Sequence, residues 1–155
     1  DFKNTIVIMT SNVGGQKILQ YKGTQIGEVY DRMRDEVLGE LRKHFRPEFL
    51  NRIDETIVFH ALKESDLKQI VEIQLGSLRE RLAERKIGVV LTDAAKTHLV
   101  RTGYDPNYGA RPLKRAIQKE IENPLARKLL TGEVKDGSTV SVDFDPSHDG
   151  LTFQA

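Results

Sequence analysis

The sequence predicts an α/β fold in two parts, with residues 1–61 forming the end of a larger α/β domain and residues 62–155 forming a small, complete α+β domain. Two continuous apolar runs of strand length, Thr5–Thr10 and Thr56–Phe59, are typical of strands buried on both faces of a parallel sheet. Apolar residues recur at helical spacing between these runs and after them. Near the C-terminus they alternate instead, which indicates a hairpin.

The first part holds one long helix between its two apolar runs. Apolar residues at helical spacing predict this helix from about Val29 to His44, and Pro47 ends or redirects it. A short helix and a loop fill residues 16–28. Because two strands and one helix cannot enclose a core by themselves, we expect residues 1–61 to be the tail of a larger domain.

The second part opens with a long helix that ends before Gly88. The apolar stripe of this helix consists of Leu67, Val71, Leu75, Leu78 and Leu82. Alternation over residues 87–91 predicts a strand. Thr92 is a suitable N-cap for the helix that follows, which reaches Thr102 and has Gly103 as its stop signal.

The last helix and a hairpin complete the second part. Pro112 suits the first turn of that helix, whose inner stripe is Leu113, Ile117, Ile121 and Leu125. Asn123-Pro124 must kink or split the helix, because proline lacks the N–H that a helix interior needs. Alternating residues predict strands over 140–144 and 151–153, joined by a turn.

The composition excludes several classes of protein. Apolar residues make up 38% of the 155 residues and charged residues 30%, which is typical of a soluble globular chain. The sequence contains neither an apolar run long enough to span a membrane nor a signal peptide, and it has no cysteine for disulfides or thiol chemistry. The net charge of +1 gives no bulk attraction to nucleic acid.

The most informative stretch for function is FRPEFLNRIDE, residues 45–55. It holds Arg46 and Arg52 around Pro47 and Asn51. A guanidinium group is always charged, and its fork of N–H donors matches phosphate and carboxylate. The segment carries no nucleophile, metal-ligand cluster or acid/base pair. It is therefore suited to holding or sensing a charged ligand.

Three segments together resemble the Clp-type AAA+ ATPases. Residues 45–55 are similar to the arginine-finger segment of that family, IVIMTSN at residues 6–12 to its sensor-one strand, and GYDPNYGARPLKR at residues 103–115 to its sensor-two motif. The resemblance is to the ClpB-type disaggregases, at the end of their second ATPase module. It implies that residues 1–61 end an AAA+ large subdomain and that residues 62–155 form the AAA+ small subdomain.

The resemblance assigns roles to two residues of the first part. Asn12 is similar to the sensor-one residue, which would orient the attacking water or contact the terminal phosphate; the alternative is that it caps the next turn. Arg52 is similar to the arginine finger, which a neighbouring subunit contributes to bound ATP. The alternative for Arg52 is a salt bridge to Asp54 or Glu55. Arg46 competes for the finger role, but its place at a corner favours a structural one.

In the second part the resemblance points to Arg111, similar to the sensor-two arginine that reads ATP bound in its own subunit. Arg111 also lies at a helix start, where the helix dipole favours an anion. Ala110 and Ile73 would border the adenine. The alternative for Arg111 is an ordinary residue of a basic helix.

Several expected features of an ATPase are absent from the sequence. No glycine is followed directly by lysine, so there is no GxxxxGK[ST] phosphate loop. Asp54-Glu55 precedes an apolar run instead of following one, which favours a structural role over a Walker B role. The four histidines lack metal-ligand spacing, so we expect no metal ligand here. We therefore expect this chain by itself to be inactive.

The resemblance implies the function of the whole protein: an ATP-driven chaperone, a hexameric ring that threads unfolded or aggregated polypeptide. ATP and Mg²⁺ would be its cofactors, bound at the subunit interface. A DnaK-type chaperone would be a partner through domains outside this chain, and neither nucleic acid nor membrane would be one. The expected location is the cytoplasm, or the matrix or stroma of an organelle in a eukaryote.

Two other functions stay open. The first is a ClpC- or ClpA-like unfoldase that serves a peptidase, since such relatives carry an apolar-Gly-apolar tripeptide in the loop after sensor one. Here that loop reads Ile26-Gly27-Glu28, and a carboxylate is costly to bury in an apolar pocket. The second is a binding module without ATP, which would use the basic helix over residues 112–130.

Overall fold

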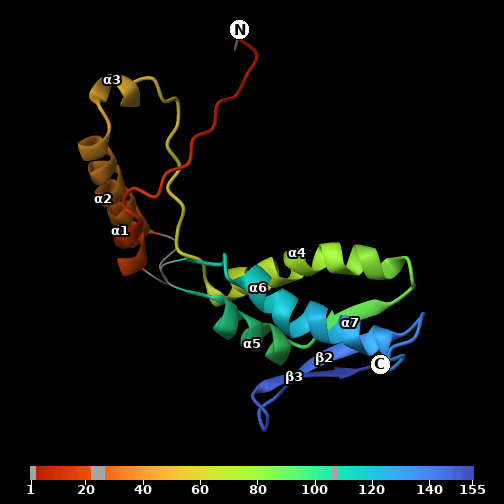
Figure 1. Ribbon diagram of the computed structural model, residues 1–155. Coiled ribbons are helices and arrows are strands. Elements are labelled where there is room, and N and C mark those ends of the chain that lie inside the picture. The colour runs from red at the N-terminus through yellow and green to blue at the C-terminus, as the bar shows by residue number, and fades with distance from the viewer. Residues whose placement is uncertain (1–2, 22–26, 106–107) are drawn as a thin grey trace. The chain divides into compact units, whose positions relative to one another are not determined.

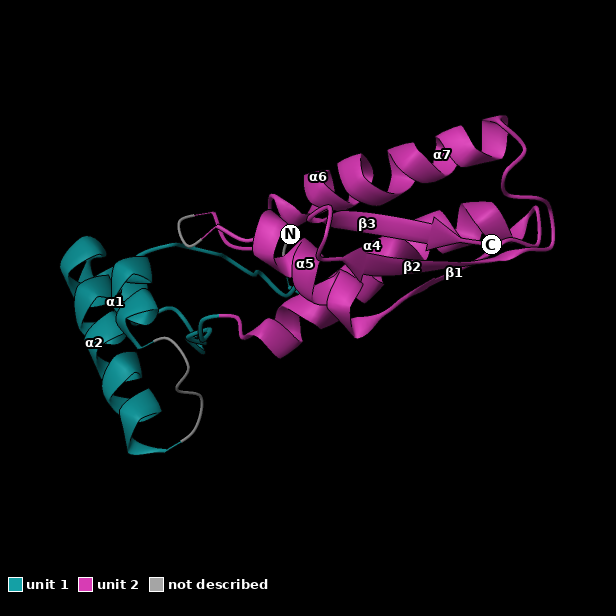
Figure 2. Cartoon of the chain, turned by 90° about the horizontal axis from the view of Figure 1, so that it is seen from below, with its two compact units in different colours: residues 1–61 teal, residues 62–155 magenta. Residues whose placement is uncertain are grey.

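The computed structural model describes residues 3–21, 27–105 and 108–155. The chain divides into two compact units, residues 1–61 and residues 62–155 (Figure 2). The helices and strands (Figure 1) are, in chain order, α1 (Gly15–Gln20), α2 (Glu28–His44), α3 (Pro47–Leu50), α4 (Glu64–Ala83), β1 (Gly88–Leu91), α5 (Asp93–Gly103), α6 (Leu113–Ile117), the π-helical turn η1 (Gln118–Glu122), α7 (Asn123–Leu130), β2 (Thr139–Asp145) and β3 (Gly150–Gln154).

The first unit is organised around α2, which spans the predicted helix. Met33 and Val37 lie buried on one face of this helix, and Val58 packs against them. The Tyr30 hydroxyl donates a hydrogen bond to the carbonyl oxygen of Val58 at 2.9 Å. Pro47 redirects the chain as predicted, because it opens the short helix α3 at a position that needs no N–H.

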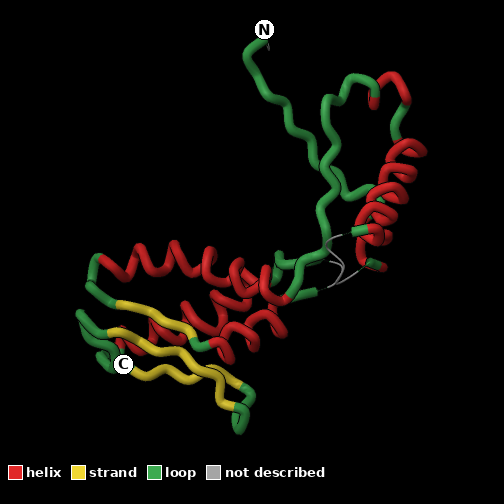
Figure 3. Tube along the Cα trace, turned by 180° about the vertical axis from the view of Figure 1, so that it is seen from behind, coloured by secondary structure: helices red, strands yellow, loops and turns green. Residues whose placement is uncertain are grey.

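The two predicted strands of the first unit are not formed. Residues 5–10 and 56–59 have no strand pairing and run as loops (Figure 3). Ile6 and Ile8 are 88% and 82% exposed, and Phe59 is 77% exposed. The physical reason is that a strand needs a hydrogen-bonded neighbour, and no other described segment of this unit pairs with either run.

The loop before α2 bears on the peptidase-partner alternative. Ile26 lies outside the described residues. Gly27 precedes α2 with φ of 91°, in the region that favours glycine, and Glu28 is the first residue of the helix. The third position of the tripeptide therefore opens a helix.

The second unit contains a three-stranded sheet in the order β1-β2-β3. β1 pairs with β2 in parallel, with Val89 opposite Val140, and β2 pairs with β3 in an antiparallel hairpin. Side chains alternate along the strands, so Val89, Val140 and Val142 are buried while Val90 is exposed. One face of the sheet is thus apolar, and the strands lie where the sequence predicts them.

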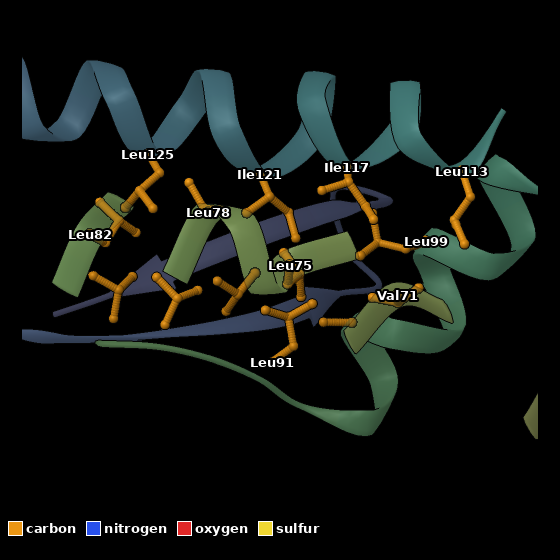
Figure 4. Close-up of a cluster of buried hydrophobic side chains, with 14 of the residues drawn as sticks. Val71, Leu75, Leu78, Leu82, Leu91, Leu99, Leu113, Ile117, Ile121 and Leu125 are labelled. Carbon is orange, nitrogen blue, oxygen red and sulfur yellow. The ribbon is translucent and has the colours of Figure 1, made fainter. Parts of the chain in front are cut away.

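The helices of the second unit enclose a single core with that face. α4 contributes Val71, Leu75, Leu78 and Leu82, and α5 contributes Leu99 (Figure 4). Thr92 caps α5 as predicted, because its hydroxyl accepts the N–H of Ala95 at 3.2 Å. α5 extends one residue beyond the predicted end and closes with Gly103.

The predicted break at Asn123-Pro124 takes the form of the π-helical turn η1. Apolar residues Leu113, Ile117, Ile121 and Leu125 are all buried and point toward the core (Figure 4). An α-helix advances about 100° per residue, so each step of four residues overshoots one turn by about 40°. The wider η1 turn, closed by the Asn123 N–H on the carbonyl oxygen of Gln118, cancels part of this drift. The stripe therefore stays on one face.

Candidate functional site

Arg52 lies in the turn that follows α3. Its backbone N–H donates to the carbonyl oxygen of Phe49 at 3.1 Å, and its side chain is exposed. The ring of Phe49 stacks on that of Phe45 with centroids 5.3 Å apart, which holds the turn. Asp54 and Glu55 make no ion pair with Arg52, and no other carboxylate in the described ranges does. The guanidinium is thus open to an external anion.

Arg46 stands at the corner between α2 and α3. Its backbone is extended, and its carbonyl oxygen accepts the N–H groups of Phe49 at 3.0 Å and Leu50 at 3.2 Å. Its backbone is therefore the N-cap of α3. Its exposed guanidinium, like that of Arg52, has no carboxylate partner among the residues described.

Asn12 lies at the end of the exposed run and leads into α1. The carbonyl oxygen of Asn12 accepts the N–H of Gly15 at 3.0 Å, and the Ser11 hydroxyl accepts the N–H of Val13 at 3.2 Å. The segment therefore forms a turn that leads into α1, whose N-cap is Gly14 without a side-chain cap. The exposed side-chain amide of Asn12 takes no part in that turn within the described residues.

A closed loop leads from α5 to Arg111. Asp105 and Gly109 exchange two backbone hydrogen bonds of 3.2 and 2.6 Å, and the Asp105 carboxylate accepts the N–H of Tyr108 at 3.2 Å. Gly109 has φ of 64°, which favours glycine at this point. Residues 106 and 107 of the loop lie outside the described residues.

Arg111 follows this loop and precedes the first turn of α6. Its N–H donates to the carbonyl oxygen of Tyr108 at 3.4 Å, and the carbonyl oxygen of Ala110 accepts the N–H of Leu113 at 3.1 Å. The side chain of Arg111 is exposed, and across the described ranges no carboxylate pairs with it. The corner thus presents another guanidinium without a carboxylate partner among the described residues.

Ala110 and Ile73 lie in different parts of the second unit. Ala110 is half-buried and packs against the core. Ile73 is 73% exposed on the outer face of α4, away from the Val71 and Leu75 stripe. A single exposed apolar side chain is common on protein surfaces, so this exposure permits an adenine contact without requiring one.

A contact that sequence reasoning missed surrounds His98, which is 5% exposed. Its Nε2 lies 2.7 Å from a carboxylate oxygen of Glu120, and its ring stacks on Phe144. Arg101 Nη2 lies 3.4 Å from Nδ1. Because a guanidinium only donates, Nδ1 accepts and Nε2 carries the proton given to Glu120. His98 is thus a structural residue, and its place on the buried face of α5 is the sequence signal that could have located it.

The basic helix is partly neutralised. Lys128 pairs with Glu133 at 2.6 Å, and Glu122 pairs with Arg81 of α4 at 3.3 Å. The described part of the chain holds no group of three or more His, Cys, Asp or Glu side chains able to bind a metal ion. Among the same residues, no helix combines the length and apolar character that crossing a bilayer requires.

The predicted site residues therefore fall in both units. Asn12 and Arg52 belong to residues 1–61, and Ile73, Ala110 and Arg111 belong to residues 62–155. Within the second unit, the corner before α6 brings Ala110 and Arg111 together. Each unit thus has an exposed guanidinium without a carboxylate partner in the described chain, Arg52 in the first and Arg111 in the second, and such a group is suited to bind phosphate.

Two family models match the chain. Residues 62–142 match the C-terminal, D2-small domain of ClpB protein, and residues 1–56 match the AAA domain (Cdc48 subfamily). Together they cover most of both units.

Individual relatives agree with these matches. The chain is 51% identical over 155 residues to a chaperone protein ClpB of Meiothermus ruber, and 52% identical over 154 residues to one of Nitratidesulfovibrio vulgaris. It spans 18% of the length of each of these relatives. Among solved structures, the S. cerevisiae Hsp104-ADP complex is similar with a TM-score of 0.81 and 40% identity, over 96% of this chain and 26% of that one.

Proposed function

We propose that the whole protein is an ATP-driven disaggregase, because this chain belongs to the ClpB family, as the C-terminal part of its second AAA+ module. It would form a hexameric ring and thread unfolded or aggregated polypeptide. In this proposal residues 1–61 end the AAA+ large subdomain and residues 62–155 form the small subdomain. The runs at residues 5–10 and 56–59 would be strands whose partners belong to the rest of the large subdomain.

One observation carries the proposal at the level of residues: Arg52 and Arg111 are both exposed, and neither pairs with a carboxylate in the described chain. Surface arginines usually gain a little stability from a nearby acid. Other exposed arginines of the described chain, such as Arg46 and Arg115, lack one as well, so the match of Arg52 and Arg111 to the ATP-contacting motifs of the family is what selects these two to bind phosphate.

Arg52 would act on the ATP of the neighbouring subunit. During hydrolysis negative charge develops on the transferring phosphoryl group, and a guanidinium placed against it stabilises the transition state more than the ground state. Arg52 would therefore contribute to the rate of hydrolysis and little to nucleotide affinity.

The other residues would act on ATP within their own subunit. Arg111 would contact its phosphates, Asn12 would orient the attacking water, and Ile73 and Ala110 would border the adenine. Mg²⁺ would be bound with ATP by residues outside this chain, because the chain has no Walker A loop or Walker B pair. For the same reason we propose that the isolated chain does not hydrolyse ATP.

The proposal extends to partners and location. A DnaK-type chaperone would act with the protein through domains outside this chain. Nucleic acid and membranes would not be partners, and the protein would work in the cytoplasm or in an organellar matrix or stroma.

Mixed rings test the role of Arg52. Full-length Arg52→Ala subunits should form rings and bind nucleotide but lose hydrolysis in the second module. Combined with subunits that lack their own Walker B acid, they should recover part of the activity, because an intact finger then faces an intact site. Phosphate release measured across mixing ratios gives the answer.

Arg46→Ala is the matched control for that experiment, since Arg46 is also exposed and lies in the same segment. It should keep most of the hydrolysis. If mixing never restores activity although both variants assemble, Arg52 acts within its own subunit or only structurally. If Arg46→Ala behaves as Arg52→Ala was expected to, the finger is Arg46.

A further inference from the structure

Helices α5 and α6 of the second unit approach each other closely near Arg111, at Gly103, which ends α5. A Cβ atom placed on Gly103 would lie 2.7 Å from Leu113 Cδ1 and 2.8 Å from Leu113 Cα. It would also lie 3.2 Å from the Cβ of Ala116. Contacts between carbon atoms are favourable at about 3.5 to 4.0 Å, so no side chain fits at residue 103 without moving α6.

The tight contact is to backbone as well as to side chain. Leu113 could change its rotamer to clear Cδ1, but its Cα moves only if the first turn of α6 moves. Leu113 is also buried, at 1% exposure, in the core shared with α4. A shift of Leu113 would therefore disturb the packing of the core.

Arg111 lies close to this contact along the chain. Leu113 is two residues away, and its N–H donates to the carbonyl oxygen of Ala110 at 3.1 Å. Between them Pro112 has restricted torsion, which transmits a shift of α6 to Arg111 with little slack. On the other side, the Asp105–Gly109 pairing closes the loop and resists a compensating movement.

We infer that Gly103 is a positioning residue for Arg111. Because residue 103 has no side chain, the start of α6 can lie close to the end of α5, where the guanidinium of Arg111 meets the nucleotide phosphates. This inference rests on the proposed role of Arg111. It adds that the nucleotide response of this module depends on a residue that touches no nucleotide.

The substitution Gly103→Ala should displace the start of α6 by roughly 1 Å, the difference between the clash and a normal contact. A displacement of that size at a binding group is expected to weaken nucleotide affinity on the order of tenfold, because charged hydrogen bonds depend steeply on geometry.

The test uses full-length protein whose first nucleotide site has been inactivated, with a fluorescent ADP analogue as the probe. Gly103→Ala should raise the Kd of the second module on the order of tenfold. Gly76→Ala is the matched control, since Gly76 also lies in a helix of this unit and a Cβ there meets nothing within 4 Å. It should bind as the unmodified protein does.

A double variant separates positioning from general damage. If Gly103 acts through Arg111, Gly103→Ala combined with Arg111→Ala should bind no more weakly than Arg111→Ala alone. If the two losses add, Gly103 acts on the whole unit and the inference is wrong. If Gly103→Ala fails to fold, Ala116→Ser adds a hydroxyl oxygen, which is smaller than a methyl group, at the same contact. It is then tested alone and combined with Arg111→Ala.

Failure of this inference differs from failure of the proposed function. If Arg111→Ala leaves the Kd unchanged, the proposed role of Arg111 is wrong. If Arg111→Ala weakens binding while a folded Gly103→Ala binds normally, the role of Arg111 stands and the positioning inference is overturned.

Discussion

The two units contain apolar segments of the same kind, yet the described structure pairs them into a sheet only in the second unit. Thr5–Thr10 and Thr56–Phe59 in the first unit are as apolar as β1 and β2 in the second. The latter pair with each other, whereas the former are unpaired in the described structure and, apart from Val58, exposed. The difference shows that an apolar run can form a strand, but does so only where a neighbouring strand pairs with it.

The cores of the two units differ accordingly. The first unit has a cluster around Met33, Val37 and Val58, whereas the second has a core to which every one of its helices and strands contributes. Stability should therefore be concentrated in residues 62–155, and the comparison can be tested at several scales.

The largest expected effect comes from separating the units. Residues 62–155 expressed alone should unfold in one cooperative thermal transition, because their core is complete within them. Residues 1–61 alone should show no such transition, since their cluster is too small to offset the entropy of ordering the chain. Circular dichroism on heating compares the two. A cooperative transition in residues 1–61 would contradict the contrast.

The next effect concerns the η1 turn. Deleting Lys119 should convert the π turn to an α turn and leave the apolar stripe on the same face, so residues 62–155 should still unfold cooperatively. Deleting Gln74 from α4 should rotate Leu75, Leu78 and Leu82 by about 100° relative to Val71 and abolish folding. Both deleted residues are exposed, which makes them matched. Equal damage from the two deletions would show that the π turn holds no surplus residue.

Single truncations should give a smaller contrast. Leu99→Ala, at a fully buried position, should lower the free energy of unfolding of the chain by about 3 kcal/mol. Val58→Ala should leave the main urea transition unchanged, because Val58 belongs to the cluster of the first unit. A loss at Val58 as large as that at Leu99 would mean that the two units unfold as one.

The smallest effect lies at the β2–β3 turn. The Ser147 hydroxyl, then His148 and the Ser147 N–H, lower the pKa of Asp145 from its ordinary 3.8 to about 2. Since the folded pKa is lowered, the stabilisation is present above pH 3.8 and is lost as the pH falls toward 2. Carboxyl-carbon NMR of residues 62–155 should give an Asp145 midpoint near 2, and Ser147→Ala should raise it. An unchanged midpoint would remove Ser147 as the cause.

The fold of the second unit could be predicted because its signals are local. Apolar spacing located α4, the Thr92 hydroxyl marked the start of α5, and alternation located β2. The π turn could have been predicted as well, since a stripe at strict steps of four cannot stay on one face of an α-helix. The unpaired runs of the first unit could not, because pairing depends on segments distant from them.

The candidate site divides in the same way. The sequence motifs identify Asn12, Arg52 and Arg111, and the roles of all three stay predictions. Local pattern could not show that Gly103 is required by packing instead of by helix termination, because that contact joins α5 to α6 across a loop. Nor could it pair His98 with Glu120, which lie on different helices.

The parallel pairing of β1 with β2 has a consequence for synthesis of the protein. β1 leaves the ribosome well before its partner, since α5, α6 and α7 must all emerge first. Until Val140 and Val142 are available, the apolar face of α4 has no sheet to complete its cover. The unit should therefore fold late and as a whole, after β2 has been released, and a chain stalled before Thr139 would display the surface that chaperones bind.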